Sequence, residues 1–166
     1  MEPNTDKYLL LLNALDDEKV SVVWNACREL AKYGDRASEA LPKLEVLLYG
    51  RDQTSALWAR FAIAKITGDT ASHLPYFVEA LSEKKRIWAG MASTAIAGFG
   101  ALASVAVPQL IQELSDEKVD NRWAAAWALA QMGDAASAAV AALAQTLQTD
   151  GDEKVRWYAA FALSEM

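Results

Sequence analysis

Small and apolar residues recur at helical spacing along the chain, most clearly in residues 116–132, DEKVDNRWAAAWALAQM. At 3.6 residues per turn, Trp123 and Trp127 fall one turn apart on one side of this stretch. The opposite side carries residues suited to packing: Asn121, Ala125, Ala128, Leu129 and Met132. The stretch predicts one helix, with an N-cap at Asp116 and a stop at Gly133.

The same pattern recurs about every 33 residues, which predicts stacked helix pairs. A glycine follows a helical run at four places, separated by 34, 32 and 33 residues: Gly34, Gly68, Gly100 and Gly133. The expected pairs are 17–33 with 37–48, 53–66 with 71–81, 83–99 with 102–114, and 116–132 with 135–147. Half repeats at 5–15 and 152–166 flank them. We therefore predict an all-α solenoid of about four helix pairs, forming a single domain over residues 1–166.

The second helix of each pair carries a plain apolar stripe, such as Leu41, Leu44 and Leu48, which indicates core. Three prolines are expected in the first turns of these helices, where a missing N–H costs little: Pro42, Pro75 and Pro108. Trp88 belongs to a column that faces inward and is also expected in the core.

The first helices share a motif, seen in NRWAAAWAL (121–129) and VRWYAAFAL (155–163). It resembles the HEAT-like repeats of the phycobilisome-lyase type, whose pattern is roughly V-R-x-x-A-A-x-A-L followed by Gly-Asp. Arg122 and Arg156 match the family arginine, whereas Val23, Ala56 and Ala89 stand in its place in the other repeats. The resemblance implies a HEAT-like α-solenoid whose "x" positions lie on the concave surface and contact partners. Members include scaffolds, regulatory subunits, chromophore lyases and a branch of DNA glycosylases.

The "x" positions of this chain are mostly aromatic or large, whereas an ordinary solenoid is polar there. Exposed aromatic patches mark binding surfaces, and Trp, Tyr and Arg dominate binding hot spots. We therefore predict a partner-binding surface of nine residues: Trp24, Arg28, Trp58, Phe61, Trp123, Trp127, Trp157, Tyr158 and Phe161. The alternative is that the rings pack against each other or against flanking helices. Pair three interrupts the surface with Gly90, Met91 and Thr94.

Charge and hydropathy narrow the range of partners. The net charge is −6 and the pI about 4.8, so a basic stripe for nucleic acid or for an anionic membrane is not expected. The run LLLLNAL is too short to span a bilayer. We expect a soluble cytoplasmic protein.

Catalytic and metal-binding patterns are missing from the sequence. His73 is the only histidine, and no Cys/His set has metal-ligand spacing. The single cysteine, Cys27, aligns with Ala126 and is expected to be a packed thiol. Acidic clusters precede the first helices and are interpreted as capping rather than as calcium ligands. We expect no cofactor and no metal, and we favour a protein that is not an enzyme.

Three functional hypotheses remain. The first is a non-catalytic scaffold that binds a peptide, a helix or a partner domain on its aromatic surface. The second, implied by the resemblance, is a lyase-like subunit that holds a bilin or another flat ligand among the indoles. The third is a relative of the HEAT-like DNA glycosylases, which the acidic charge disfavours. A further hypothesis is a homodimer through the C-terminal repeat end, at Phe161, Leu163 and Met166.

Overall fold

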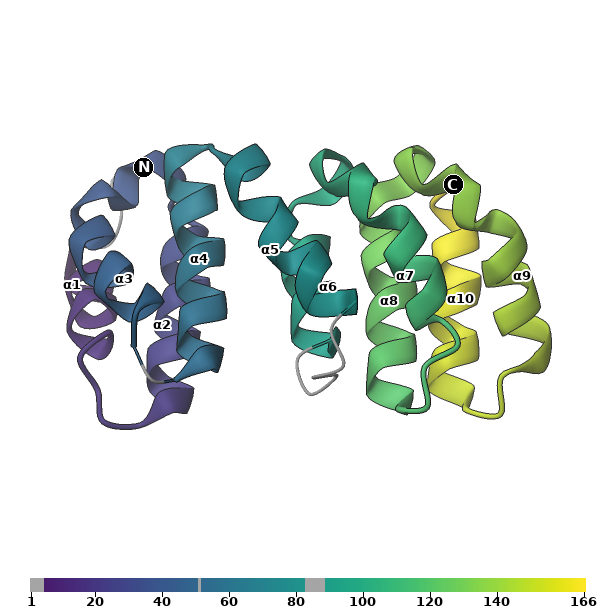
Figure 1. Cartoon of the computed structure of the whole chain (residues 1–166). Coiled ribbons are helices and arrows are strands. Elements are labelled where there is room, and N and C mark those ends of the chain that lie inside the picture. The colour runs from purple at the N-terminus through teal and green to yellow at the C-terminus, as the bar shows by residue number, and fades with distance from the viewer. Residues whose placement is uncertain (1–4, 51, 83–88) are drawn as a thin grey trace. The chain divides into compact units, whose positions relative to one another are not determined.

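A computed structural model describes residues 5–50, 52–82 and 89–166, and it contains helices and turns without a strand in these ranges (Figure 1). The chain divides into two compact units, Met1–His73 and Leu74–Met166, which are described one at a time. The expectation of one domain over the whole chain stays a prediction. In the described part, no helix is both long and apolar enough to cross a membrane.

The first unit contains two helix layers. Its elements are α1 (Thr5–Ala14), α2 (Val20–Ala31), the 3-10 helix η1 (Gly34–Ala40), α3 (Leu41–Leu48) and α4 (Gln53–Thr67), followed by the start of α5 (Thr70–Ser82). Helices α2 and α4 pack side by side, α1 lies against α2, and α3 lies against α4. Leu30, Leu44 and Leu57 are among its fully buried side chains.

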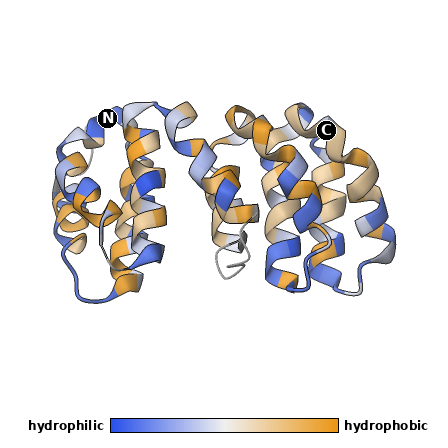
Figure 2. Ribbon diagram, viewed as in Figure 1, coloured by the Kyte–Doolittle hydropathy of each residue, from blue (hydrophilic) through white to orange (hydrophobic). Residues whose placement is uncertain are grey.

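The second unit repeats this arrangement. After the rest of α5 come α6 (Ala89–Ala97), η3 (Gly100–Ala106), α7 (Val107–Glu113), α8 (Val119–Met132), η4 (Gly133–Ala139), α9 (Val140–Thr149) and α10 (Glu153–Ser164). Helix α8 packs between α6 and α10. Helix α7 packs against α8, and helix α9 packs against α10 (Figure 1). Leu110, Leu129 and Leu143 are fully buried, and the loops that precede α8 and α10 are hydrophilic (Figure 2). The all-α solenoid fold is confirmed.

The second helices begin differently from the prediction. In three repeats the expected helix starts as a 3-10 segment (η1, η3 or η4) that contains one non-helical residue: Ala37, Ala103 or Ala136. Pro42 and Pro108 then lie in the first turn of α3 and α7, as predicted. Pro75 does not, because it lies inside α5. This helix begins directly at Thr70, where Asp69 Oδ1 accepts a hydrogen bond from Ser72 N–H (3.1 Å).

The glycines at the predicted stops adopt positive φ, from 54° at Gly133 to 75° at Gly68. A Cβ at Gly100 would lie 3.3 Å from the Gln131 carbonyl oxygen, and one at Gly133 would lie 3.2 Å from the Glu165 carbonyl oxygen. Glycine is therefore needed at these two positions for two reasons. The backbone has a positive φ, and the first helix of the next repeat approaches closely.

The start of helix α8 was predicted too far toward the N-terminus. Helix α8 begins at Val119 with Lys118 as its N-cap, so Asp116 is not the cap. The Asp116 carboxylate instead organises the loop, because Oδ1 accepts hydrogen bonds from Lys118 N–H (2.8 Å) and Asn121 Nδ2 (3.1 Å). The first helix expected over 83–99 is described from Ala89 onward. Residues 83–88, including Trp88, lie outside the described residues.

Candidate interaction surface

Four aromatic side chains of the second unit meet across the contact between α8 and α10. The ring of Trp123 stacks on that of Tyr158 with centroids 5.4 Å apart and planes at 26°. Trp157 meets Tyr158 edge-on (4.9 Å, 89°) and stacks on Phe161 (5.6 Å, 15°). We call these four residues the α8–α10 aromatic cluster. Such offset and edge-on contacts are the geometries that aromatic pairs prefer.

Exposure within this cluster is uneven. The Trp157 residue is 60% exposed, whereas Trp123, Tyr158 and Phe161 are half-buried. Trp127 lies on α8 one turn after Trp123 and is also half-buried. The close ring contact of Trp123 is made with the neighbouring helix. The cluster therefore presents one large exposed ring, that of Trp157, which is held in place by half-buried aromatic rings.

Charged side chains lie against Trp123. Its indole N–H donates to Asp120 Oδ1 (2.9 Å), and Lys154 Nζ lies 3.6 Å from its ring centroid. The ammonium is well within the distance at which a cation is attracted to an indole face. Trp123 is thus oriented by its own helix and covered by the next one.

The aromatic residues of the first unit form a different arrangement. Trp24 stacks on Trp58 (6.3 Å, 28°), and Phe61 meets Trp58 edge-on (5.7 Å, 88°). The Arg28 guanidinium lies over both indoles, 5.7 Å from the Trp24 centroid and 5.0 Å from that of Trp58. Trp58 is 4% exposed and Phe61 9%. The expected exposure is therefore wrong for these two residues, because Trp58 is packed between Trp24, Phe61 and Arg28.

An arginine links the repeats of the second unit beside this cluster. Arg122 Nε donates to Asp150 Oδ2 (2.7 Å) and Nη2 donates to Asp150 Oδ1 (3.0 Å), in a two-pronged ion pair. Nη1 of Arg122 donates to the carbonyl oxygens of Asp116 (2.9 Å) and Glu117 (3.2 Å). Arg156 Nη1 in turn donates to the Asp150 carbonyl oxygen (2.7 Å). The family arginine therefore joins helix α8, and likewise helix α10, to the loop that precedes that helix.

The ion pair changes the acidity of Asp150. Burial by itself raises the pKa of this carboxyl, but hydrogen bonds from Arg122 and from Asp152 N–H hold the pKa below its ordinary value. The hydrogen bond to Asp150 raises the pKa of Arg122. Asp152 is the N-cap of α10 and accepts from Val155 N–H (3.1 Å), which confirms the capping interpretation for this residue. Sequence reasoning missed the inter-repeat role of Asp150, although Asp116 and Asp150 share the 34-residue spacing of Arg122 and Arg156.

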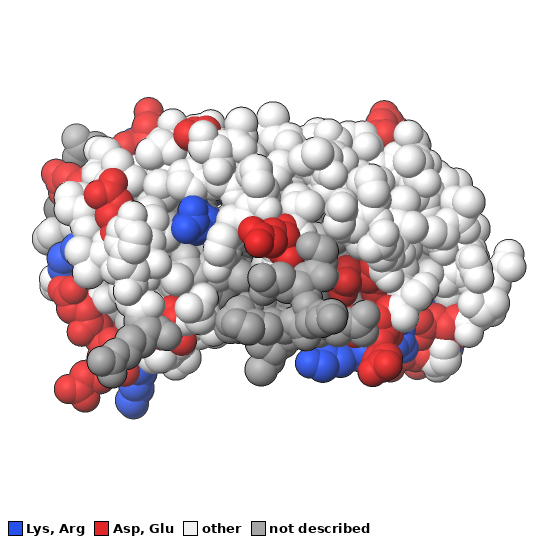
Figure 3. All heavy atoms as spheres, in the orientation of Figure 1, with Lys and Arg blue, Asp and Glu red and all other residues white. Residues whose placement is uncertain are grey.

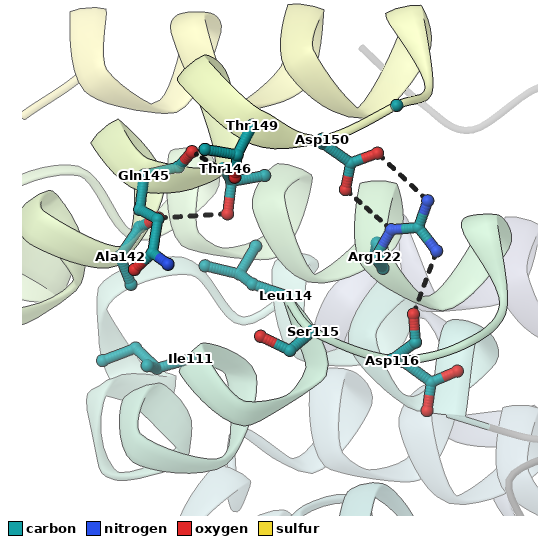
Figure 4. Close-up of a pocket in the computed structure, with 11 residues that line it drawn as sticks. Ile111, Leu114, Ser115, Asp116, Arg122, Ala142, Gln145, Thr146, Thr149 and Asp150 are labelled. Atoms are coloured by element: carbon teal, nitrogen blue, oxygen red, sulfur yellow. Dashed lines mark hydrogen bonds and ion pairs between the residues drawn. The ribbon is translucent and has the colours of Figure 1, made fainter.

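A polar cavity of about 520 Å³ lies beside this ion pair, between the ends of α7 and α9 (Figure 4). Ser115, Gln145, Thr146 and Thr149 contribute to its lining. Thr146 Oγ1 donates to the Ala142 carbonyl oxygen (3.0 Å), and Thr149 Oγ1 donates to that of Gln145 (3.0 Å). The two threonine hydroxyls and the guanidinium at this cavity are thus occupied by internal contacts.

The single cysteine is not suited to act as a nucleophile. Cys27 is fully buried, and burial raises the pKa of its thiol to about 12, so the packed thiol is confirmed. Burial and the nearby Arg60 lower the pKa of His73. Among the described residues, no group of three or more His, Cys, Asp and Glu side chains could hold a metal ion.

On the face shown in Figure 3, charged side chains of the second unit gather along its lower edge.

Several solved structures share this fold. A designed armadillo repeat protein in complex with the peptide (KR)4 is 23% identical, with a TM-score of 0.62 over 93% of this chain and 80% of that one. The complex of CpcE and CpcF of phycocyanin lyase from Nostoc sp. PCC7120 is 20% identical, with a TM-score of 0.61 over 95% of this chain and 64% of that one. An engineered protein is 24% identical, with a TM-score of 0.60 over 98% and 80%. At these identities the likeness concerns the fold alone.

Sequence comparison identifies the repeat type. No curated protein matches the chain closely enough to count as a relative. The family model for HEAT repeats, however, matches residues 74–164, which is more than half of the chain. This match agrees with the motif, with the arginine links between repeats and with the paired helices. The chain belongs to the HEAT-repeat family.

Proposed function

We propose that the chain is a non-catalytic protein-interaction scaffold, and that the α8–α10 aromatic cluster binds a peptide, a helix or a partner domain. The observation that carries this proposal is the 60% exposure of Trp157 beside the rings of Tyr158 and Phe161. An indole offers a large contact area at a low cost in conformational entropy. Covering it with a partner is therefore favourable.

The arrangement of the cluster supports binding rather than folding as the role of Trp157. Phe161 and Tyr158 hold the ring by stacking and by an edge contact, so its position is set before a partner arrives. A pre-positioned side chain loses little freedom on binding, which favours affinity. Trp123, with its hydrogen bond to Asp120 and its cation–π contact with Lys154, would form the more polar rim of the same surface.

The test selects binding peptides from a random library displayed on phage and titrates them against variants of the chain. We expect Trp157→Ala to weaken the selected peptides by about 2 kcal/mol, roughly thirtyfold, as truncation of a hot-spot residue does. Tyr49→Ala is the matched control, because Tyr49 is 90% exposed but lies on the first unit, at the end of α3. Selected peptides that bind Trp157→Ala and Trp123→Ala as well as the wild type would contradict the proposal.

The bilin hypothesis stays a prediction with a separate test. A bilin held among the indoles would quench tryptophan fluorescence with one-to-one stoichiometry, and Trp157→Ala would reduce that quenching. If a saturating concentration of bilin does not displace the bound peptide, the surface binds proteins rather than bilin.

A further inference from the structure

The 3-10 segments η1, η3 and η4 each expose two residues at equivalent positions of the repeat. In η3 these residues are Leu102 and Val105, which are 71% and 66% exposed. The residues that follow them, Ala103 and Ala106, are fully buried, so each segment has an inward and an outward side. The equivalent exposed residues are Arg36 and Glu39 in η1, and Ala135 and Ala138 in η4.

The outward side is charged in the first unit and almost uncharged in the second. Residues 98–112 contain no charged residue, and residues 133–149 contain only Asp134. Charged side chains of the second unit gather along its lower edge in Figure 3. The connections from α6 to α7 and from α8 to α9, which contain η3 and η4, run along its upper edge in Figure 1. Large apolar side chains exposed together on such a surface indicate an interaction site.

Exposure of this side does not depend on whether a further repeat follows. Segment η4 packs beside η3, so the neighbouring repeat is already in place next to Leu102 and Val105. These two side chains stay exposed all the same, because the repeats stack beside the outward positions and not over them. A group that covers Leu102 and Val105 therefore has to come from outside the stack of repeats.

Segments η3 and η4 together carry both halves of a self-complementary contact. Leu102 and Val105 project from η3, while the neighbouring η4 has only the small side chains of Ala135 and Ala138 at the equivalent positions. We call these four residues the η3–η4 face. A two-fold axis that runs between the two segments, parallel to them, places the large pair of each copy opposite the alanine pair of the other copy.

We propose that the η3–η4 face docks a second copy of this chain in a two-fold dimer. Two chains with a net charge of −6 each repel one another, and this face brings them together without burying an unpaired charge. Val140, which is 42% exposed, and the exposed Ala141 extend the contact onto the start of α9. The inference goes beyond the proposed scaffold function, because a dimer presents the α8–α10 aromatic cluster twice and raises the avidity for a partner with two binding sites.

The first test is sedimentation equilibrium of the full chain, in which we expect a monomer–dimer equilibrium. Leu102→Arg should weaken dimerisation by at least about tenfold, because it buries a guanidinium without a partner. The change should leave the circular dichroism spectrum unaltered, since Arg36 occupies the equivalent position of η1. Val46→Arg is the matched control and should leave dimerisation unchanged, because Val46 is 72% exposed but lies on α3 of the first unit.

A charge exchange between two variants then tests the pairing of η3 with η4. Ala135→Glu by itself should also weaken dimerisation, because the carboxylate meets Leu102 of the other copy. An equimolar mixture of Leu102→Arg and Ala135→Glu chains should associate again. In such a heterodimer the introduced guanidinium meets the introduced carboxylate, and the second contact, Leu102 on Ala135, is that of the wild type. A mixture that stays monomeric would contradict the two-fold arrangement.

Three further results would overturn the inference. They are a wild-type chain that stays monomeric up to about 1 mM, a dimer that Leu102→Arg leaves intact, and a monomer that binds phosphatidylcholine vesicles through Leu102, which would assign the face to a lipid surface. Trp157→Ala should dimerise like the wild type. Peptide binding by a monomeric chain would therefore leave the proposed function standing and remove this inference alone.

Discussion

The two units use the same aromatic stack in opposite ways. Trp24 stacks on Trp58 in the first unit, and Trp123 stacks on Tyr158 in the second, with interplanar angles of 28° and 26°. In the first unit Arg28 covers both indoles, and Trp58 is 4% exposed. In the second, Trp127 stands at the position of Arg28, and α10 adds the 60% exposed Trp157. The stack is therefore more deeply buried in the first unit and lies beside an exposed ring in the second, depending on the residues at the neighbouring positions of the repeat.

The largest expected effect follows from the burial of Trp58. Replacing a buried indole with alanine removes its contacts and leaves a cavity, so Trp58→Ala should destabilise the first unit by about 3–5 kcal/mol. Cys27 is the single cysteine and is buried in α2, so its rate of thiol labelling reports opening of this unit. We expect labelling of Cys27 to accelerate strongly in the variant. A rate equal to that of the wild type would place Trp58 outside the core.

The second effect concerns the arginine link, which the first unit lacks because Val23 stands at the position of Arg122. Asp150→Asn should lower the free energy of unfolding at neutral pH by about 2–3 kcal/mol. This is less than the about 3–5 kcal/mol of a fully buried pair, because the guanidinium stays partly exposed. Denaturant unfolding followed by circular dichroism measures the difference, and Glu117→Gln on the adjacent exposed loop position is the control.

The same pair predicts a pH dependence with a definite sign. The pKa of Asp150 is lower in the folded chain than its ordinary value of about 3.9, so its stabilisation is present above that value. It is lost as the pH falls below about 4 toward the folded pKa. The stability difference between wild type and Asp150→Asn should therefore be constant from pH 7 to about 5 and shrink in more acidic solution. A difference that grows on acidification would contradict the assignment.

The smallest expected effect on stability is that of Trp157→Ala. An exposed side chain contributes little to folding, so the change should alter the free energy of unfolding by about 0.5 kcal/mol or less. Its large effect should appear in peptide binding alone. A loss of stability as large as that of Trp58→Ala would make Trp157 a structural residue.

The sequence was sufficient for the fold because its strongest signals are local. Glycine is required wherever the backbone takes positive φ, so Gly34, Gly68, Gly100 and Gly133 marked the helix ends correctly. The 3-10 segments carry no such signal, since alanines such as Ala37 and Ala136 are compatible with α-helix and with a tighter turn. Pro75 shows that a proline near a predicted start does not fix where the helix begins.

Exposure of the aromatic residues could not be predicted in the same way. Periodicity places Trp58 and Trp157 at neighbouring "x" positions of their first helices but does not reveal what lies above each ring. The stacking of Trp58 under Trp24 and Arg28 depends on contacts between repeats. The role of Asp150 likewise depends on a contact with Arg122, 28 residues earlier. These pairings become visible only when successive repeats are aligned and packed together.

The contrast between Trp58 and Trp157 can be measured directly by incorporating 5-fluorotryptophan and recording ¹⁹F spectra in H₂O and in D₂O. The variants Trp58→Phe and Trp157→Phe assign the two resonances. The structure predicts a large solvent isotope shift for Trp157 and almost none for Trp58. Equal shifts for the two, or a Trp157 resonance insensitive to solvent, would contradict the account.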